Sequence, residues 1–210
     1  MAANNMNATT RIAARHAGFS MIEVLISLLI IVLGLLGLAG MQVRMQQSEF
    51  ESYQRAQAII LMQDMVERIH LHRLTASCFR YTDASTGSPF LGVNAGSIAS
   101  CSAGTSNDNA QADAALAEWS GLLQGAAETL GGASVGAMVG ARGCVSYDGA
   151  TELLDPVGVA IPTTGIYTVA VAWQGTTDTF APTVNCANTL YGAETRRRVV
   201  STTFRLGYLK

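Results

Sequence analysis

The most distinctive pattern in this chain is a long apolar run close to its N-terminus. Between Arg15 and Arg44, the only Asp, Glu, Lys or Arg is Glu23. An apolar helix of about 20 residues spans about 30 Å, which matches the hydrocarbon core of a bilayer. Residues 19–44 are therefore predicted to form a membrane-spanning helix that carries a single carboxylate near its start.

After residue 45 the pattern becomes amphipathic, so that one side of a helix would be apolar. The apolar positions step by three or four residues: Phe50, Tyr53, Ala56, Ile59, Met62, Val66 and Ile69. No proline interrupts the chain before Pro89. One helix is thus predicted from near Phe19 to about Ser77, on the order of 85 Å long. Its second half would have one face to bury.

The remainder of the chain is predicted to form loops, a second helix and an antiparallel sheet. Residues 79–112 are rich in Gly, Ser, Asn and Asp and indicate a long loop. A helix is expected over 111–130, with Gly131 and Gly132 ending it. Its apolar face would hold Leu116, Trp119, Leu123, Ala126 and Leu130.

Strands are expected over 137–147, 166–174 and 196–206, and a short strand over 151–154 would complete a first hairpin after the turn at Asp148 and Gly149. With turns between the strands, the pattern favours an antiparallel sheet. The sheet would cover the apolar face of the long helix. The fold class is therefore α+β.

The residues before the apolar run have the features of a cleaved leader. Arg11 and Arg15 precede Gly18, and Glu23 lies five residues after that glycine. An ordinary secretory leader has its apolar core before the cleavage site, whereas here the core follows it. We therefore interpret residues 1–18 as a leader removed between Gly18 and Phe19. The basic flank places the N-terminus in the cytoplasm and the head domain, residues 45–210, outside the membrane.

Charge and cysteine content agree with an extracytoplasmic domain. The chain has 13 basic and 15 acidic residues, a balance that argues against a general nucleic-acid binder. Its four cysteines all follow the apolar run and are too far apart for a zinc motif, so two disulfides are expected. Three pairings are open on sequence alone. We expect Cys78–Cys101 and Cys144–Cys186, because each pair joins neighbours along the chain.

Glu23 requires an explanation because a carboxylate in hydrocarbon costs at least about 2.5 kcal/mol. Cleavage after Gly18 would create a cationic partner, the amine of Phe19. The two residues are four apart and would pair within one helix, or between neighbouring subunits of an assembly. We therefore predict an assembly role for Glu23 rather than a catalytic one.

The stretch Gly18-Phe19-Ser20-Met21-Ile22-Glu23 resembles the processing motif of type IV pilins and type II secretion pseudopilins. With the segment IYTVAVAW, Cys186, the cluster Arg196–Arg198 and the closing strand, the chain resembles type IV pilus minor pilins of the PilV group. The resemblance implies a long helix packed on an antiparallel sheet. The leader is longer than is common in this class, so translation could instead start at Met6.

The resemblance also implies a life cycle and a set of partners. A membrane prepilin peptidase would cleave after Gly18, and Phe19 would be N-methylated. The protein would reside in the inner membrane with its head in the periplasm. It would then join other minor pilins and the major pilin at the pilus tip, initiating assembly and supporting adhesion and twitching motility.

Three other functions share single features with this sequence. A type II secretion pseudopilin shares the N-terminal motif. A periplasmic enzyme is disfavoured, because His70 and His72 do not share a helix face and the chain has no hydrolase, zinc-protease or phosphate-loop motif. DNA binding is also disfavoured, because Arg196, Arg197 and Arg198 would alternate faces on a solvated strand at a sheet edge. No cofactor, metal or small-molecule substrate is expected.

Overall fold

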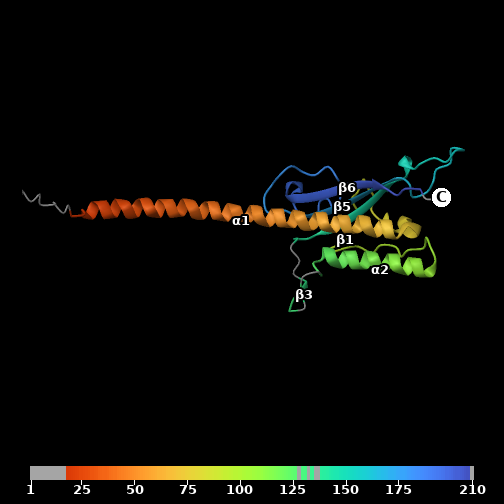
Figure 1. The fold of residues 1–210 in the computed structure, drawn as a ribbon, viewed down its shortest axis with the longest axis horizontal. Coiled ribbons are helices and arrows are strands. Elements are labelled where there is room, and N and C mark those ends of the chain that lie inside the picture. The colour runs from red at the N-terminus through yellow and green to blue at the C-terminus, as the bar shows by residue number, and fades with distance from the viewer. Residues whose placement is uncertain (1–17, 127–128, 132, 135–137, 209–210) are drawn as a thin grey trace, which may run out of the picture. The chain divides into compact units, whose positions relative to one another are not determined.

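The computed structural model describes residues 18–126, 129–131, 133–134 and 138–208 (Figure 1). Its helices are α1 (Met21–Leu71) and α2 (Ser106–Leu123), with short 3₁₀ segments η1 (Arg73–Phe79), η2 (Gly149–Thr151) and η3 (Glu194–Arg196). Its strands are β1 (Leu91–Gly92), β2 (Thr129–Leu130), β3 (Ala133–Ser134), β4 (Arg142–Asp148), β5 (Ile166–Gln174) and β6 (Arg197–Arg205). The α+β fold predicted from the sequence is confirmed.

The chain divides into two compact units between Gln46 and Gln47. The first unit, as far as it is described, is the apolar part of α1 and the residues just before it. The second unit, the head unit, contains the rest of α1 and all the strands. The predicted leader, with Arg11 and Arg15, lies outside the described residues except for Gly18.

Helix α1 starts later and ends earlier than the sequence pattern predicted. Ser20 stands at its N-terminus, where its hydroxyl accepts a hydrogen bond from the Ile22 N–H at 3.3 Å. Such a cap satisfies one of the donors that a helix N-terminus leaves unpaired. The predicted end near Ser77 is wrong, because the α-helix stops at Leu71 and residues 73–79 form 3₁₀ turns with non-helical angles at Thr75.

The head part of α1 supplies one side of the hydrophobic core. Its buried positions are Gln54, Ala58, Met62, Met65 and Ile69. The predicted apolar face is therefore wrong for its first half, because Phe50 and Tyr53 are largely exposed. The core is completed by residues of α2 and of the sheet, including Leu116, Trp119, Val145, Tyr167, Val169 and Val171.

The main sheet is antiparallel with the order β1-β4-β5-β6. Strand β5 lies inside the sheet and is buried on both faces. One face joins the core with α1. Its opposite face, Ala170 and Ala172, packs against Cys144, Cys186 and Tyr191 in a second, smaller cluster. The expected strand at 166–174 is confirmed to the residue.

Helix α2 is displaced toward the N-terminus relative to the expected range of 111–130. It begins at Ser106 because Thr105 and Asp108 form a reciprocal capping box. It ends at Leu123 because Gly125, at a φ of 87°, closes the helix with hydrogen bonds typical of a Schellman motif. Leu130, predicted to be helical, lies in β2.

The expected strand over 151–154 is also wrong. After β4 the Asp148 side chain accepts a hydrogen bond from the Ala150 N–H at 3.0 Å, and the chain makes the 3₁₀ turn η2. The partner of β4 is instead β5, with Tyr147 opposite Tyr167. The short strand β1, which pairs with β4 on its other side, gave no recognisable signal in the sequence.

A close contact between α2 and β4 holds the head unit together. Trp119 is fully buried, and its indole N–H donates to the Leu61 carbonyl of α1 at 2.8 Å. Its ring lies directly over Gly143 of β4, where a Cβ atom would overlap with the ring and approach Leu123 to 2.8 Å. Glycine at this position therefore allows the tryptophan to join helix and sheet.

We expect Gly143→Ala to destabilise the head unit by about 2 kcal/mol, because overpacking a rigid core typically costs 1–3 kcal/mol. The measurement is the urea midpoint of the full chain in detergent. Gly96→Ala is the matched control, because a Cβ atom at Gly96 meets nothing within 4 Å. Equal midpoints for the two variants would contradict this packing argument.

Candidate functional site

The predicted processing junction is accessible in the structure. Phe19 is 82% exposed, and no other part of the described chain comes within 4 Å of a Cβ atom built at Gly18. Both residues precede α1, so the peptide bond between them is not part of the helix. A peptide bond that is exposed and outside a helix is open to a peptidase.

Glu23 lies in the first turn of α1. A carboxylate is favoured there because the N-terminus of a helix carries a partial positive charge. Phe19, however, precedes the capping residue Ser20 and is not on the helix. The amine that would pair with Glu23 exists only after cleavage, so this pairing stays a prediction.

No described residue of the first unit covers the side chains that follow Glu23. Every residue from Gly18 to Phe50 is exposed, including the apolar positions of the run. Helix α1 is long and apolar enough to cross a membrane. A surface of this kind needs lipid or other apolar helices around it.

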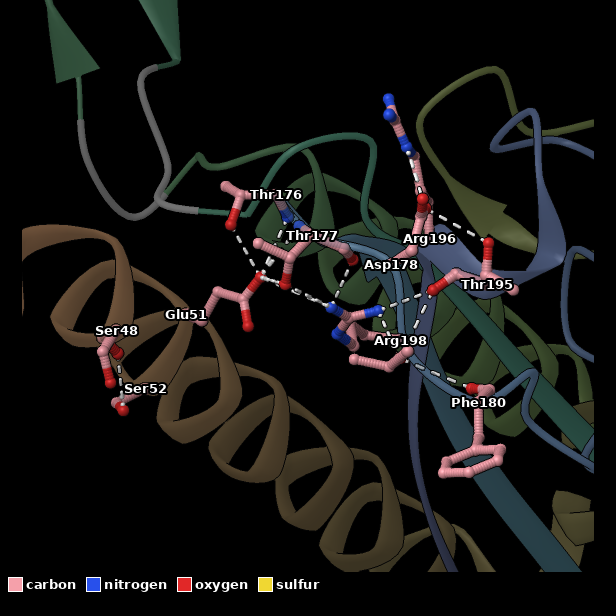
Figure 2. A network of polar contacts seen from close by, with 11 residues as sticks. Ser48, Glu51, Ser52, Thr176, Thr177, Asp178, Phe180, Thr195, Arg196 and Arg198 are labelled. Atoms are coloured by element: carbon pink, nitrogen blue, oxygen red, sulfur yellow. Dashed lines mark hydrogen bonds and ion pairs between the residues drawn. The ribbon is translucent and has the colours of Figure 1, made fainter. Parts of the chain in front are cut away.

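A polar network within the head unit is centred on Glu51, which is on α1 (Figure 2). One oxygen of its carboxylate, Oε1, accepts hydrogen bonds from the backbone N–H groups of Thr176 and Thr177, at 3.0 and 3.3 Å. Both threonine hydroxyls donate to the same oxygen, at 2.7 and 3.3 Å. Arg198 of β6 approaches it at 3.4 Å. Glu51 thereby ties the loop after β5 to α1.

The environment of Glu51 favours its charged form. Burial acts to raise the pKa of Glu51, but the hydrogen bonds from Thr176 and Thr177 and the charge of Arg198 outweigh this effect. The pKa therefore lies below its ordinary value. Sequence analysis did not identify this residue, because its partners are 125 or more positions away along the chain.

The three arginines predicted to form a solvated edge have different environments. Arg197 is almost fully buried, and its guanidinium group contacts Glu194 at 2.6 Å and three backbone carbonyls. Arg198 is mostly buried and bonded to the loop at Thr177 and Thr179. Only Arg196 is half exposed, and it pairs with Asp178. The expected position at a sheet edge is confirmed, because β6 is the last strand of the sheet. The expectation that the three arginines are solvated is wrong, because the side chains of Arg197 and Arg198 are mostly buried.

The structure pairs Cys78 with Cys101 and Cys144 with Cys186, as expected from their order along the chain. The first disulfide closes the loop between η1 and α2. The second joins β4 to the loop before η3 and lies in the smaller cluster with Tyr191. In the chain-entropy view, cross-links of this span each contribute roughly 3–4 kcal/mol.

The two histidines of the described chain, His70 and His72, each pack against an aromatic ring. His70 packs against Phe204 with ring centroids 5.1 Å apart, and His72 packs against Phe79 at 5.7 Å. Within the part of the chain that the structure describes, no group of three or more His, Cys, Asp or Glu could hold a metal ion. Trp119 is fully buried in the core, as its place on the apolar face of the predicted helix implied.

Comparison with protein families gives two adjacent matches. The model described as "Prokaryotic N-terminal methylation motif" matches residues 13–39, which include the Gly18–Phe19 junction and Glu23. The model described as "Type IV pilin Tt1218" matches residues 40–115, from the middle of α1 into α2. Together the two matches cover residues 13–115, and over this part the chain is similar to type IV pilins. No curated protein and no solved structure matches the chain.

The two matches and the fold agree with each other. A pilin has a long N-terminal helix that is apolar in its first part and packs on an antiparallel sheet in its second, and this chain shows both. The methylation motif implies processing by a prepilin peptidase and assembly with other pilins. It also implies that the apolar part of α1 is anchored in the inner membrane before assembly.

Proposed function

We propose that the chain is a minor pilin of the type IV pilus, of the PilV group. The observation that carries this proposal is the Gly18–Phe19 junction, followed at a fixed distance by Glu23 in an otherwise uncharged helix of membrane length. The match to the methylation motif, over residues 13–39, includes Gly18, Phe19 and Glu23. The resemblance of the C-terminal strands to the PilV group supports the assignment to a minor pilin.

In this proposal the protein has two successive locations. It is first an inner-membrane protein with its N-terminus in the cytoplasm and its head in the periplasm, an oxidising compartment that suits two disulfides. After cleavage it enters a filament tip with other minor pilins and the major pilin. There it initiates assembly and contributes to adhesion and twitching motility.

The decisive experiment is mass spectrometry of the protein extracted from membranes. We expect Phe19 as the N-terminal residue, carrying one methyl group, because Gly18 and Phe19 lie exposed before the helix. A Gly18→Leu variant is the matched control and should retain its leader. An intact leader in the native protein, or an N-terminus beyond the apolar run, would overturn the proposal.

A type II secretion pseudopilin is the second candidate, because that class shares the N-terminal motif. The two functions differ in the phenotype of a strain that lacks the protein. A minor pilin is expected to be required for surface pili and twitching, with protein secretion unchanged. Loss of secreted enzymes with normal pili would establish the pseudopilin assignment instead.

A further inference from the structure

Strand β6 forms one edge of the main sheet, and no described strand pairs with its outer side. The Gly175 N–H donates to the Arg196 carbonyl at 2.8 Å, just beyond the register of the β5–β6 ladder. Hydrogen-bonded pairs alternate along an antiparallel ladder, so every second residue from 198 to 204 bonds to β5. The backbone groups that point away from the sheet are therefore those of Val199, Ser201, Thr203 and Arg205.

These outer backbone groups are open to solvent. Within the described parts of the chain, no hydrogen bond is found for the backbone of Val199, Ser201 or Thr203 on this side. Ser201 and Thr203 are exposed. On the other side of the sheet, beyond the end of β1, the N–H and carbonyl of Val145 both bond to Thr82, at 3.1 and 2.9 Å. The fold thus satisfies backbone groups there and leaves those of β6 open.

The open edge also lacks the features that usually prevent pairing with another chain. Proteins commonly protect an edge with a short strand, a proline or charged side chains. Strand β6 has nine residues, and residues 199–204, VVSTTF, contain no proline and no charge. The side chains of Arg197 and Arg198 are mostly buried. Arg205, at the end of the strand, is the one charged residue of β6 that is exposed.

We propose that the open edge of β6 binds an extended segment of another protein, which joins the sheet as a further strand. A polypeptide backbone in the extended conformation presents alternating N–H and carbonyl groups at the spacing that the edge requires. Main-chain hydrogen bonds then supply the affinity, and the side chains on either face supply the specificity. The proposal concerns the head unit and stands whether or not the chain is a pilin.

The charge of Arg205 indicates what the added segment carries. Among the described residues, its guanidinium group contacts the Thr164 carbonyl at 3.5 Å and has no carboxylate partner. An acidic residue opposite Arg205 would form a favourable cross-strand pair. A second copy of this chain is a poorer occupant, because antiparallel pairing of two β6 strands about Thr202 places Val199 opposite Arg205. The expected partner is therefore an uncharged extended segment with an acidic residue at one end.

The test measures hydrogen exchange of the backbone amides by NMR, with the full chain in detergent micelles. The probe is the capped peptide Glu-Val-Thr-Val-Thr-Val-Thr, whose glutamate lies opposite Arg205 when the peptide pairs antiparallel with residues 199–205. It is titrated into the millimolar range, where a short peptide is expected to saturate the edge. The control peptide has methyl groups on its glutamate and threonine nitrogens, which removes the donors that would face β6.

We expect exchange at Val199, Ser201 and Thr203 to slow about tenfold at a peptide concentration ten times the Kd, because only the free protein then exchanges at these amides. The amides of Val200 and Thr202 already bond to β5, so their exchange should change little. The methylated peptide should slow none of them. Unchanged exchange at the three outer amides, or equal protection by the methylated peptide, would overturn the proposal.

A variant of the protein tests the same edge from its other side. Thr203→Pro removes an outer donor without removing a bond to β5, and should weaken peptide binding roughly tenfold. Thr203→Val keeps the donor and should bind the peptide as the native protein does. Native binding by Thr203→Pro would contradict the proposal. Protection of the outer amides that rises with protein concentration, without peptide, would identify a second copy as the occupant and overturn the assignment to another protein.

Discussion

Replacing Arg197 by alanine is expected to destabilise the head unit by about 3–5 kcal/mol, the range found when one partner of a buried ion pair is removed. Only 2% of its side chain is exposed. Its guanidinium group donates to Glu194 and to the carbonyls of Val184 and Cys186, at 2.6, 2.7 and 3.3 Å. Alanine would leave these acceptors, and the Pro182 carbonyl, without their donor.

Arg196→Ala is the matched control for this prediction. Its side chain is 52% exposed and makes one ion pair, with Asp178 at 3.2 Å. Exposed pairs contribute about 0–1 kcal/mol, so the control should lose little stability. Urea unfolding of both variants in detergent, with the disulfides intact, provides the comparison. A loss below about 1 kcal/mol for Arg197→Ala would show that the loop does not depend on this arginine.

Arg197→Lys tests whether charge alone is sufficient. Lysine keeps the positive charge but lacks the planar fork of donors that reaches several acceptors at once. We therefore expect Arg197→Lys to recover only part of the stability. The guanidinium group of Arg197 holds the loop 182–186 in place by donating to three of its backbone carbonyls. One of them belongs to Cys186 of the second disulfide.

Strand β5 was predictable from the sequence, whereas the buried face of α1 was not. The side chains of 166–174 alternate between two faces, which predicts a strand, and the predicted bounds are those of β5. For α1, the expected face from Phe50 to Ile59 advanced in steps of three residues, each of which falls about 60° short of a full turn. A row of residues with this spacing winds around the helix and does not stay on one face. The observed buried set, from Gln54 to Ile69, uses mainly steps of four and stays on one side.

The candidate sites also differ in whether nearby residues in the sequence are enough to identify them. The processing junction and Glu23 were identifiable because the whole signal lies within a few residues. The roles of Glu51 and Arg197 depend on loops brought together by the fold, and their charges gave no local indication of burial. Arg197 in particular is the middle of three consecutive arginines, and only the structure distinguishes it from its neighbours.

The last prediction concerns Glu23, which we propose is required for assembly. Removing its carboxylate should abolish incorporation into filaments, while membrane insertion and cleavage remain normal. A carboxylate in hydrocarbon costs at least about 2.5 kcal/mol, so it needs a cationic partner. The amine that cleavage exposes at Phe19 can be supplied by the same chain or by a neighbouring subunit. In the second arrangement, the match would fix the axial position of each subunit.

The experiment compares Glu23→Ala with Glu49→Ala, which removes a carboxylate from an exposed position on the same helix after the apolar run. Mass spectrometry of membrane extracts should show Phe19 as the N-terminus in both variants. Sheared filaments, or complexes purified with partner pilins, should contain Glu49→Ala and lack Glu23→Ala. The attraction between Glu23 and an amine is strengthened where water is excluded, and salt screens it little there. Lowering the salt concentration should therefore not restore the assembly of Glu23→Ala. If Glu23→Ala assembled as well as the native protein, the proposed pairing would be refuted.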